Sequence, residues 1–206
     1  MSTAAAAPPS TLVLGPEDNG ILMTPEEFDA IEEYDEDYGY ELINGVLIVS
    51  PVPTPREHSL NDLLAYFLLK YQHEHPQGAA LADTLPEHIV ETGPNRRRAD
   101  RVIWAGLGRM PDYKADPPAI IIEFVSKRRR DRRRDLEQKR DEYLGLEIAE
   151  YWAFDRFQRK LFVFITTPTG IEERVLTENE IYQTPLLPGF EFPVARFLTL
   201  AEKRGL

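Results

Sequence analysis

Apolar residues recur at helical spacing along residues 58–75 and predict a long helix. The positions that carry this pattern lie three or four residues apart, on one helix face: Leu60, Leu63, Leu64, Phe67, Leu68 and Tyr71. Thr54, Pro55 and Glu57 supply an N-cap, a first-turn proline and an N3 glutamate. We therefore expect the helix to begin at Pro55 and to end near His75, and the same capping pattern predicts a short helix after Thr24.

Alternating or continuous apolar runs of strand length occupy much of the remaining chain. Residues 38–50 alternate around Asn44 and Gly45, a two-residue turn signal that is typical of a β-hairpin. The other predicted strands lie at residues 79–90 with a kink at Pro86, 100–104, 120–125 and 150–154, and a second hairpin at 160–166 and 172–176.

A third helix is predicted between the strands at 120–125 and 150–154, because Leu136, Lys139 and Tyr143 share one helix face. The order is then helix, three strands, helix and strand, with added β-hairpins at the N-terminal and C-terminal ends. This order indicates an α/β or α+β core in which helices flank a mixed central sheet.

The length of 206 residues fits one domain around one hydrophobic core. We expect a single domain over residues 21–206, preceded by an Ala- and Pro-rich tail, residues 1–20, that is expected to be disordered. The tail lacks the features of a secretory signal, and no segment reaches the ~20 apolar residues of a membrane helix. Since the chain also has no cysteine, a cytoplasmic protein is expected.

Glu123 interrupts the most apolar strand, residues 118–126, and is the first candidate for chemistry. A buried carboxylate needs a cation, a metal or a proton to offset its lost hydration. Asp100 opens the preceding strand, so both carboxylates can lie at one end of the sheet and form an oxygen site for Mg²⁺ or Mn²⁺. The alternative is structural: Asp100 caps a turn, and Glu123 pairs with an arginine of the following basic segment. Spacing alone does not separate the two interpretations.

Lys139 favours the functional interpretation, because it lies on the helix face that packs on the sheet. An inward lysine is costly unless it finds an anion, and Glu123 and Asp100 are the nearest candidates. Its ammonium could orient an attacking water or stabilise charge on a phosphate. The alternative is a lysine that pairs with Asp135, one turn earlier on the helix.

An ordered series of short motifs between Met23 and Phe164 resembles the Uma family of putative restriction endonucleases, in the PD-(D/E)XK nuclease superfamily. The residues that carry the resemblance are Tyr40, Glu41, Leu42, Asn44 and Gly45; Ser50, Pro51 and His58; Asp100; Glu123, Phe124, Val125 and Ser126; Asp135, Lys139 and Tyr143; and Glu150, Tyr151, Trp152 and Asp155.

The resemblance implies a restriction-endonuclease-like core and a Mg²⁺-dependent phosphodiesterase site. Asp100 matches the motif aspartate and Glu123 the second acidic ligand, and the backbone carbonyl of Phe124 is a further candidate ligand. The usual lysine two residues after the glutamate is Val125 in this chain. Lys139 occupies the position from which a helix lysine takes that role in the family.

His58 and Glu41 also match family positions and are weaker candidates. A neutral imidazole at His58 could bind the metal or position the phosphate. The alternatives are a solvated histidine in the first helical turn and an exposed strand glutamate in the first hairpin.

The net charge of −11 argues against a protein that coats nucleic acid, but the charges are segregated along the chain. Residues 26–41 hold nine acidic residues and no basic ones. Lys127, Arg128, Arg129 and Arg130 directly follow the candidate ligands, and with arginines 132–134 they could contact a DNA backbone. The alternative is a solvated helix face with internal ion pairs.

These observations lead to the hypothesis of a Mg²⁺-dependent endonuclease that hydrolyses DNA phosphodiester bonds. The rival hypothesis is a catalytically inactive nuclease-fold module that binds a basic partner through its acidic segment. Cleavage of both strands of a duplex calls for two active sites, so a homodimer is expected.

Overall fold

A computed structural model describes residues 13–126, 132–146 and 148–205. The chain forms two compact units. The smaller unit consists of Met1–Val52 and Gly93–Arg96, and the larger unit of Pro53–Thr92 and Arg97–Leu206. The expectation of a single domain over residues 21–206 stays a prediction.

The smaller unit is built on the predicted hairpin. Its elements are β1 (Val13–Leu14), η1 (Pro16–Asp18), α1 (Pro25–Asp29), β2 (Glu33–Tyr34), β3 (Tyr38–Ile43) and β4 (Val46–Pro51). Asn44 and Gly45 form the turn, and both adopt positive φ, which explains the turn signal in the sequence. The predicted capping box of α1 is confirmed, because the Thr24 N–H donates to Glu27 Oε2 at 2.7 Å and the Glu27 N–H donates to Thr24 Oγ1 at 3.2 Å.

Ordered structure begins earlier than the sequence predicted. Residues 13–20, assigned to the tail, contain β1 and η1, while residues 1–12 lie outside the described residues. The physical reason is Leu14, which is buried in an apolar cluster with Met23, Tyr40, Leu42 and Leu47. Burial of this side chain offsets the entropy lost in ordering the segment.

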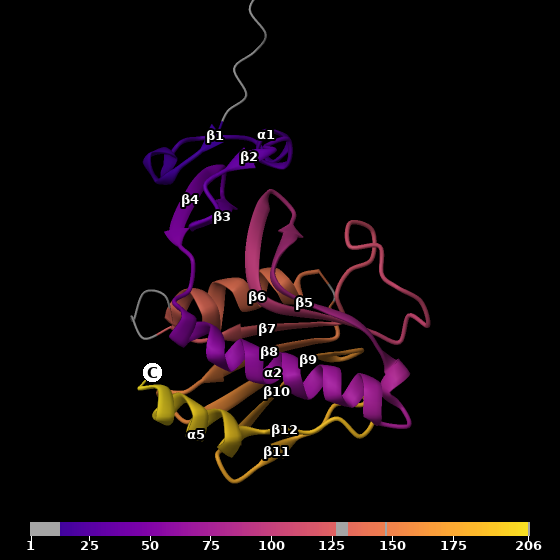
Figure 1. Cartoon of the computed structure of the whole chain (residues 1–206). Helices are drawn as coiled ribbons and strands as arrows, with labels where there is room; N and C mark the ends of the chain where they lie inside the picture. The colour runs from indigo at the N-terminus through magenta and orange to yellow at the C-terminus, as the bar shows by residue number, and fades with distance from the viewer. Residues whose placement is uncertain (1–12, 127–131, 147, 206) are drawn as a thin grey trace, which may run out of the picture. The chain divides into compact units, whose positions relative to one another are not determined.

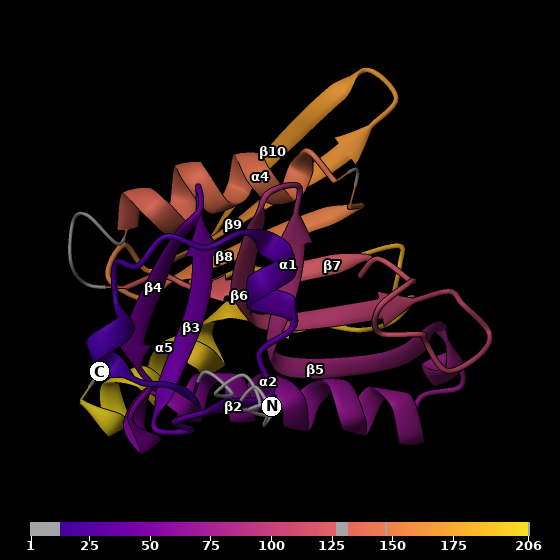
Figure 2. The same cartoon turned by 90° about the horizontal axis from the view of Figure 1, so that it is seen from above.

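A mixed sheet forms the centre of the larger unit (Figures 1 and 2). Its strands are β5 (Leu81–Thr92), β6 (Asn95–Ala105), β7 (Ile120–Phe124), β8 (Glu150–Asp155), β9 (Lys160–Thr167) and β10 (Gly170–Thr177). The order is β10-β9-β8-β7-β6, with β5 paired to β6. β7 and β8 are parallel, and β6–β7, β8–β9 and β9–β10 are antiparallel. The strands therefore match those predicted from the apolar runs.

Helices pack on both faces of this sheet, so its central strands are apolar on both sides. Ile120 and Ile122 of β7 belong to an apolar cluster with α2 (Pro55–Glu74) and α5 (Val194–Arg204), whereas Ile121 belongs to a second cluster with α4 (Lys139–Leu144). The π-helix η3 (Arg134–Gln138) directly precedes α4. Two short strands, β11 (Ile181–Tyr182) and β12 (Phe192–Pro193), pair with each other.

No helix among the described residues is long and apolar enough to cross a membrane.

Candidate active site

The candidate site lies where the backbone pairing of β6 and β7 ends. The last recorded pair on this side is Arg101 with Ile122, and Asp100 and Glu123 each come one position further along their strands. There the Phe124 N–H donates to Asp100 Oδ2 at 2.6 Å, so a side chain continues the contact between the strands. Both carboxylates thus come from rigid elements, which fixes their positions.

Lys139 pairs with Glu123. The Lys139 ammonium donates to Glu123 Oε1 at 2.8 Å and to the carbonyl of Arg98 at 2.7 Å. Only 3% of Lys139 and 2% of Glu123 is exposed, so the pair is almost fully desolvated. Of the pairings considered from the sequence, Lys139 with Glu123 is therefore one that the structure forms.

Two buried residues near this pair were not identified as site residues from the sequence. The Tyr143 hydroxyl donates to Glu123 Oε1 at 3.2 Å. Asp135 accepts a hydrogen bond from the Ser126 N–H at 3.2 Å and one from Arg134 at 3.1 Å, and so connects the end of β7 to η3. Tyr143 follows Lys139 by four positions on α4, which places both side chains on the face toward Glu123.

Glu87 is a third group that sequence reasoning did not assign to the site. It follows Pro86 in β5 and adopts φ 51°, a left-handed conformation that is uncommon for a residue with a Cβ atom. Its carboxylate pairs with Arg98 at 2.6 Å, and its negative charge acts on Asp100. Arg98 therefore contacts Glu87 through its side chain and Lys139 through its carbonyl.

The electrostatic environment disfavours two ionised carboxylates without a further cation. Burial raises the pKa of Asp100 to about 6, against the lowering effects of Lys139 and the Phe124 N–H. Burial also raises the pKa of Glu123 above its ordinary value, although the Lys139 ammonium opposes the rise, and the charges of Asp100 and Asp135 add to it. A divalent cation at this position would relieve both effects.

The protein atoms available fit Mg²⁺ or Mn²⁺ in kind, since both ions prefer carboxylate and carbonyl oxygens. Asp100 Oδ2 and Glu123 Oε1 are engaged in the hydrogen bonds given above, which leaves the second oxygen of each carboxylate as a candidate ligand. The carbonyl of Phe124 is the third candidate. Across residues 13–126, 132–146 and 148–205, no set of three or more His, Asp or Glu side chains lies close enough to hold a metal. Water or substrate oxygens would therefore have to complete the coordination.

His58 lies in the first turn of α2 and is half-buried. It precedes Asn61 by three positions, so the two side chains are neighbours on the helix surface. Asn61 donates to the carbonyl of Asp100 at 2.7 Å and accepts from Arg101 at 2.6 Å, which ties α2 to β6 beside the site. A role for His58 stays a prediction. Glu41 is buried in β3 of the smaller unit, and its role also stays a prediction.

The basic segment is only partly described. Lys127, Arg128, Arg129 and Arg130 lie outside the described residues, so contact with DNA stays a prediction for them.

The arginines that follow, at positions 132–134, already have acidic partners. Arg132 binds the buried Asp155 through two hydrogen bonds of 3.0 and 2.5 Å, Arg133 pairs with Glu137 at 2.9 Å, and Arg134 pairs with Asp135. Internal pairing, which the sequence permitted, therefore occurs at positions 132–134.

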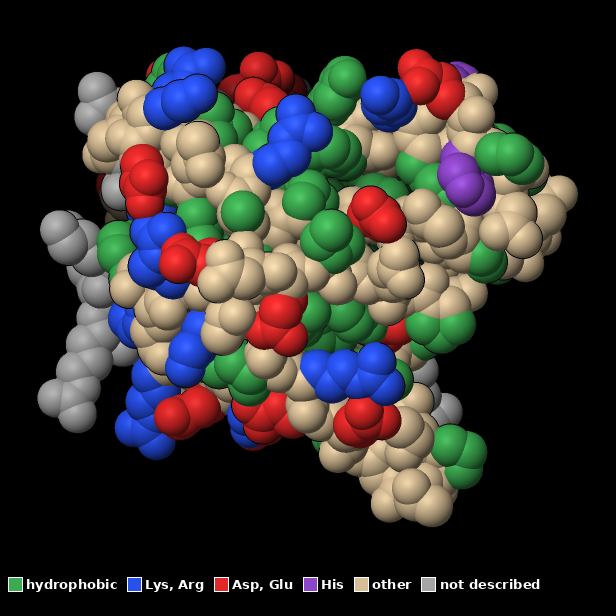
Figure 3. All heavy atoms as spheres, turned by 90° about the horizontal axis from the view of Figure 1, so that it is seen from below, with side chains coloured by type: hydrophobic (Ala, Val, Ile, Leu, Met, Phe, Trp, Pro, Cys, Tyr) green, Lys and Arg blue, Asp and Glu red, His purple; other side chains and the backbone are tan. Residues whose placement is uncertain are grey.

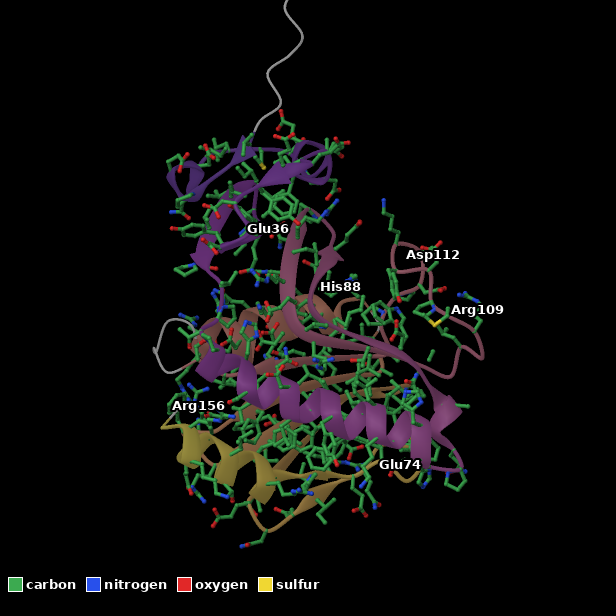
Figure 4. All side chains as sticks on the ribbon, in the orientation of Figure 1. Glu36, Glu74, His88, Arg109, Asp112 and Arg156 are labelled. Carbon is green, nitrogen blue, oxygen red and sulfur yellow. The ribbon has the colours of Figure 1, made fainter. Side chains whose placement is uncertain are left out.

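The charged residues of the loop between β6 and β7 lie apart from this cluster. Figure 4 shows Arg109 and Asp112 in the loop between β6 and β7, away from the sheet. Arg109 binds Asp116 of the same loop at 2.6 and 2.8 Å. On the side where α5 lies, Figure 3 shows acidic and basic side chains interspersed among apolar ones, without a field of one sign. This side is therefore a poor surface for a phosphate backbone.

The raised pKa of Asp100 predicts that Asp100→Asn stabilises the metal-free protein at neutral pH. The folded state keeps the Asp100 proton to a higher pH than the unfolded chain does, so the stability of the natural protein falls as the pH rises toward about 6. The variant lacks this penalty, and we expect it to unfold at a melting temperature roughly 2–8 °C higher, from about 1–2 kcal/mol for a half-buried group.

Thermal unfolding at several pH values checks this prediction. The difference between Asp100→Asn and the natural protein should shrink as the pH falls toward the ordinary pKa of aspartate. Asp141→Asn, at a surface position of α4, is the matched control and should leave the melting temperature unchanged. A lower melting temperature of Asp100→Asn at pH 7 would show that the ionised carboxylate stabilises the fold.

Comparison with known proteins gives a family and a fold for this chain. The family model Uma2, described as "Putative restriction endonuclease", matches residues 25–195. No curated protein matches the chain. A crystal structure of a putative nuclease belonging to DUF820, from Anabaena variabilis ATCC 29413, is similar with a TM-score of 0.65 and 15% sequence identity, and the match covers 87% of this chain and 99% of that one. At this identity the likeness concerns the fold, and it confirms the predicted mixed α+β class.

Proposed function

Because the chain belongs to the Uma2 family of putative restriction endonucleases, we propose that it is a Mg²⁺-dependent nuclease that hydrolyses phosphodiester bonds in DNA. The observation that carries the proposal is the buried Lys139–Glu123 pair beside Asp100. Two carboxylates and one ammonium group, held on adjacent strands and a covering helix, provide the charges that phosphoryl transfer requires.

Each residue of the cluster has a role that follows from its contacts. Asp100 and Glu123 would hold the cation, together with the carbonyl of Phe124. When bound, a divalent cation polarises the phosphate and lowers the pKa of a coordinated water. Lys139, positioned by Glu123 and by the Arg98 carbonyl, would orient the attacking water or stabilise negative charge on the phosphate. Tyr143 is a positioning residue, since its hydroxyl fixes Glu123 Oε1.

The basic segment next to β7 is proposed to hold the DNA backbone. Lys127, Arg128, Arg129 and Arg130 directly follow Ser126, at the end of the strand that carries Glu123. Replacing all four by alanine should weaken DNA binding at low salt and should flatten the plot of log K against log salt by about 0.9 per lost phosphate contact. Fluorescence anisotropy with the inactive Glu123→Gln background measures this slope.

The control for the basic segment is a variant with Lys203→Ala and Arg204→Ala, which removes two exposed charges from α5. It should bind DNA with the slope of the natural sequence. An unchanged slope in the fourfold variant would assign the phosphate contacts to another part of the chain.

The test of the proposed function is cleavage of supercoiled plasmid DNA with and without Mg²⁺ or Mn²⁺. We expect cleavage only with the metal, and we expect Asp100→Asn to abolish it. Cleavage in the presence of a chelator, or in Asp100→Asn, would refute the metal-dependent site. Absence of both cleavage and metal binding in the natural protein would support the rival hypothesis of an inactive nuclease-fold module.

A further inference from the structure

β10 forms one edge of the sheet, and its side chains are almost all exposed. β9 pairs with it along its full length, from Gly170 with Thr167 to Thr177 with Lys160. Figure 2 shows the β9–β10 hairpin extending past the rest of the sheet with β10 outermost. Ile171 is 58% exposed and Val175 is 42% exposed, so two β-branched apolar residues face solvent on an open edge. Such an edge is a template for pairing with another strand.

The alternation of backbone hydrogen bonds shows which residues of β10 point outward. The Thr166 N–H donates to the carbonyl of Ala149, so the even-numbered residues of β9 bond toward β8 and the odd-numbered ones toward β10. In this register the even-numbered residues of β10 bond to β9, and the N–H and carbonyl groups of Ile171, Glu173 and Val175 point away from the sheet. In agreement, the Thr177 N–H donates to Glu180 Oε2 at 2.7 Å and not to β9.

On the opposite side of the larger unit, a helix side chain contacts the start of β5. β5 pairs with β6, and Gln72 of α2 donates to the carbonyls of Leu81 and Ala82, the first two residues of β5, at 2.9 and 3.3 Å. Within the described residues, no comparable group covers Ile171, Glu173 or Val175. β10 is therefore an edge of the larger unit at which strand addition is possible.

We propose that β10 pairs in antiparallel fashion with β10 of a second copy of this chain, around a twofold axis at Glu173. A twofold axis that passes perpendicular to the sheet at one residue pairs odd-numbered residues with odd-numbered ones and even-numbered residues with even-numbered ones. With the axis at Glu173, Ile171 lies opposite Val175 of the second copy. This axis also places Glu172 opposite Arg174 of the second copy, twice by symmetry. Two apolar pairs and two opposite-charge pairs face each other, and such directly opposed pairs stabilise antiparallel strands.

The order of charged residues along β10 favours pairing with a second copy of this chain. It also favours a twofold axis at Glu173 over one at a neighbouring residue. A centre at Arg174 would place two arginines opposite each other and Glu173 opposite Val175, and a centre at Glu172 would place two glutamates opposite each other. The centre at Glu173 has one unfavourable pair, Glu173 with its own copy. Within one chain Arg174 binds Glu172 at 2.7 Å, so both side chains already lie on the same face of the strand. The pairing creates one continuous sheet through both copies.

Charge reversal tests whether the pairing is between copies. Arg174→Glu places two acidic residues opposite each other at both symmetric positions, and Glu172→Arg places two basic residues there. Each variant alone should therefore be monomeric at about 50 mM salt, where charge pairs are weakly screened. Their equimolar mixture restores both opposite-charge pairs across the axis and should form heterodimers. Sedimentation velocity measures the mass of the natural protein, of each variant and of the mixture.

A single cysteine tests the position of the axis, because the chain has no cysteine of its own. Hydrogen-bonded antiparallel positions lie about 5.5 Å apart at Cα, within disulfide reach. Glu173→Cys should form a disulfide-linked dimer on oxidation, and Thr169→Cys, in the hairpin turn, should not. Circular dichroism verifies that each variant is folded.

A dimeric natural protein, monomeric single reversals and a dimeric mixture would support the proposal. A monomeric natural protein, reversal variants that dimerise as it does, or a mixture that stays monomeric would overturn it. These outcomes do not depend on nuclease activity, so failure of the dimer and failure of the proposed function are distinguishable.

Discussion

The Glu123→Gln variant is expected to remain folded and to lose about 10³-fold or more of Mg²⁺-dependent DNA cleavage, the effect of removing roughly 4 kcal/mol of transition-state stabilisation. Glutamine keeps the size of the side chain and an oxygen that can accept the hydrogen bonds from Lys139 and Tyr143. It removes the negative charge that would hold the cation. The rate of plasmid cleavage at saturating DNA measures the loss, and the melting temperature verifies the fold.

Glu150→Gln is the matched control for this variant. Glu150 is equally buried, in the neighbouring strand β8, where it accepts hydrogen bonds from Trp152, Tyr182 and Thr184 at 2.6–2.9 Å. Its substitution should change stability and leave the cleavage rate near that of the natural protein. Equal activity of Glu123→Gln and Glu150→Gln would remove Glu123 from the mechanism.

Lys139→Met is expected to lower cleavage by about 10²–10³-fold and to make stability strongly dependent on pH. Methionine fills a similar volume but leaves Glu123 buried without its cation, and breaking a buried ion pair in this way typically costs about 3–5 kcal/mol. Protonation of Glu123 limits that cost at low pH. Urea unfolding between pH 5 and pH 8, together with plasmid cleavage, measures both effects.

The direction of the pH dependence follows from the pKa of Glu123. Without Lys139 this pKa rises further above its unfolded value, because the cation that lowers it is gone. The folded state then binds an additional proton, so the free energy of unfolding falls as the pH rises above the unfolded pKa. We expect the stability loss of Lys139→Met to be small at pH 5 and large at pH 8.

A double variant separates the structural and chemical parts of this effect. Lys139→Met combined with Glu123→Gln removes both charges, so it should recover most of the stability at pH 8 and none of the activity. A Lys139→Met variant that cleaves DNA at the natural rate would show that Lys139 serves the fold alone.

Glu123 and Lys139 could each be singled out from the sequence, because a local pattern points to each of them. Glu123 stands out as one charge in an apolar strand, and helical spacing places Lys139 on the helix face that packs on the sheet. Sequence alone could not decide between Glu123 and Asp135 as the partner of Lys139. That choice depends on where the π-helical turn η3 directs each side chain, which periodicity of 3.6 residues does not describe.

Glu87 could not be placed from local patterns, for a different reason. Its approach to Asp100 depends on the path of β5 after Pro86 and on a left-handed residue at that point, and propensity does not favour glutamate there. Tyr143 could have been assigned to the site, because its position on the same helix face as Lys139 was recognised. Packing of its ring in the apolar core explained that position equally well. A buried tyrosine hydroxyl near a predicted carboxylate is a signal that could have found it.

Helix α5 could also have been predicted from the sequence. Val194, Phe197, Leu198 and Ala201 follow the spacing of one helix face, and all four are buried against the sheet in the structure. The pairing of Arg132 with Asp155 was not predictable, because it joins the residues just before η3 to the end of β8 across 23 residues. Such a contact is set by tertiary packing and has no local signature.

The most direct test of the proposed metal site is a crystal structure with Mn²⁺, in which the ion is located by its anomalous scattering. We expect one peak within coordination distance, about 2.0–2.3 Å, of a carboxylate oxygen of Asp100 and one of Glu123, with Lys139 still bonded to Glu123. The same crystals of Glu123→Gln should show no peak. A fully occupied Mn²⁺ elsewhere in the chain, with Asp100 and Glu123 free of metal, would contradict the central claim.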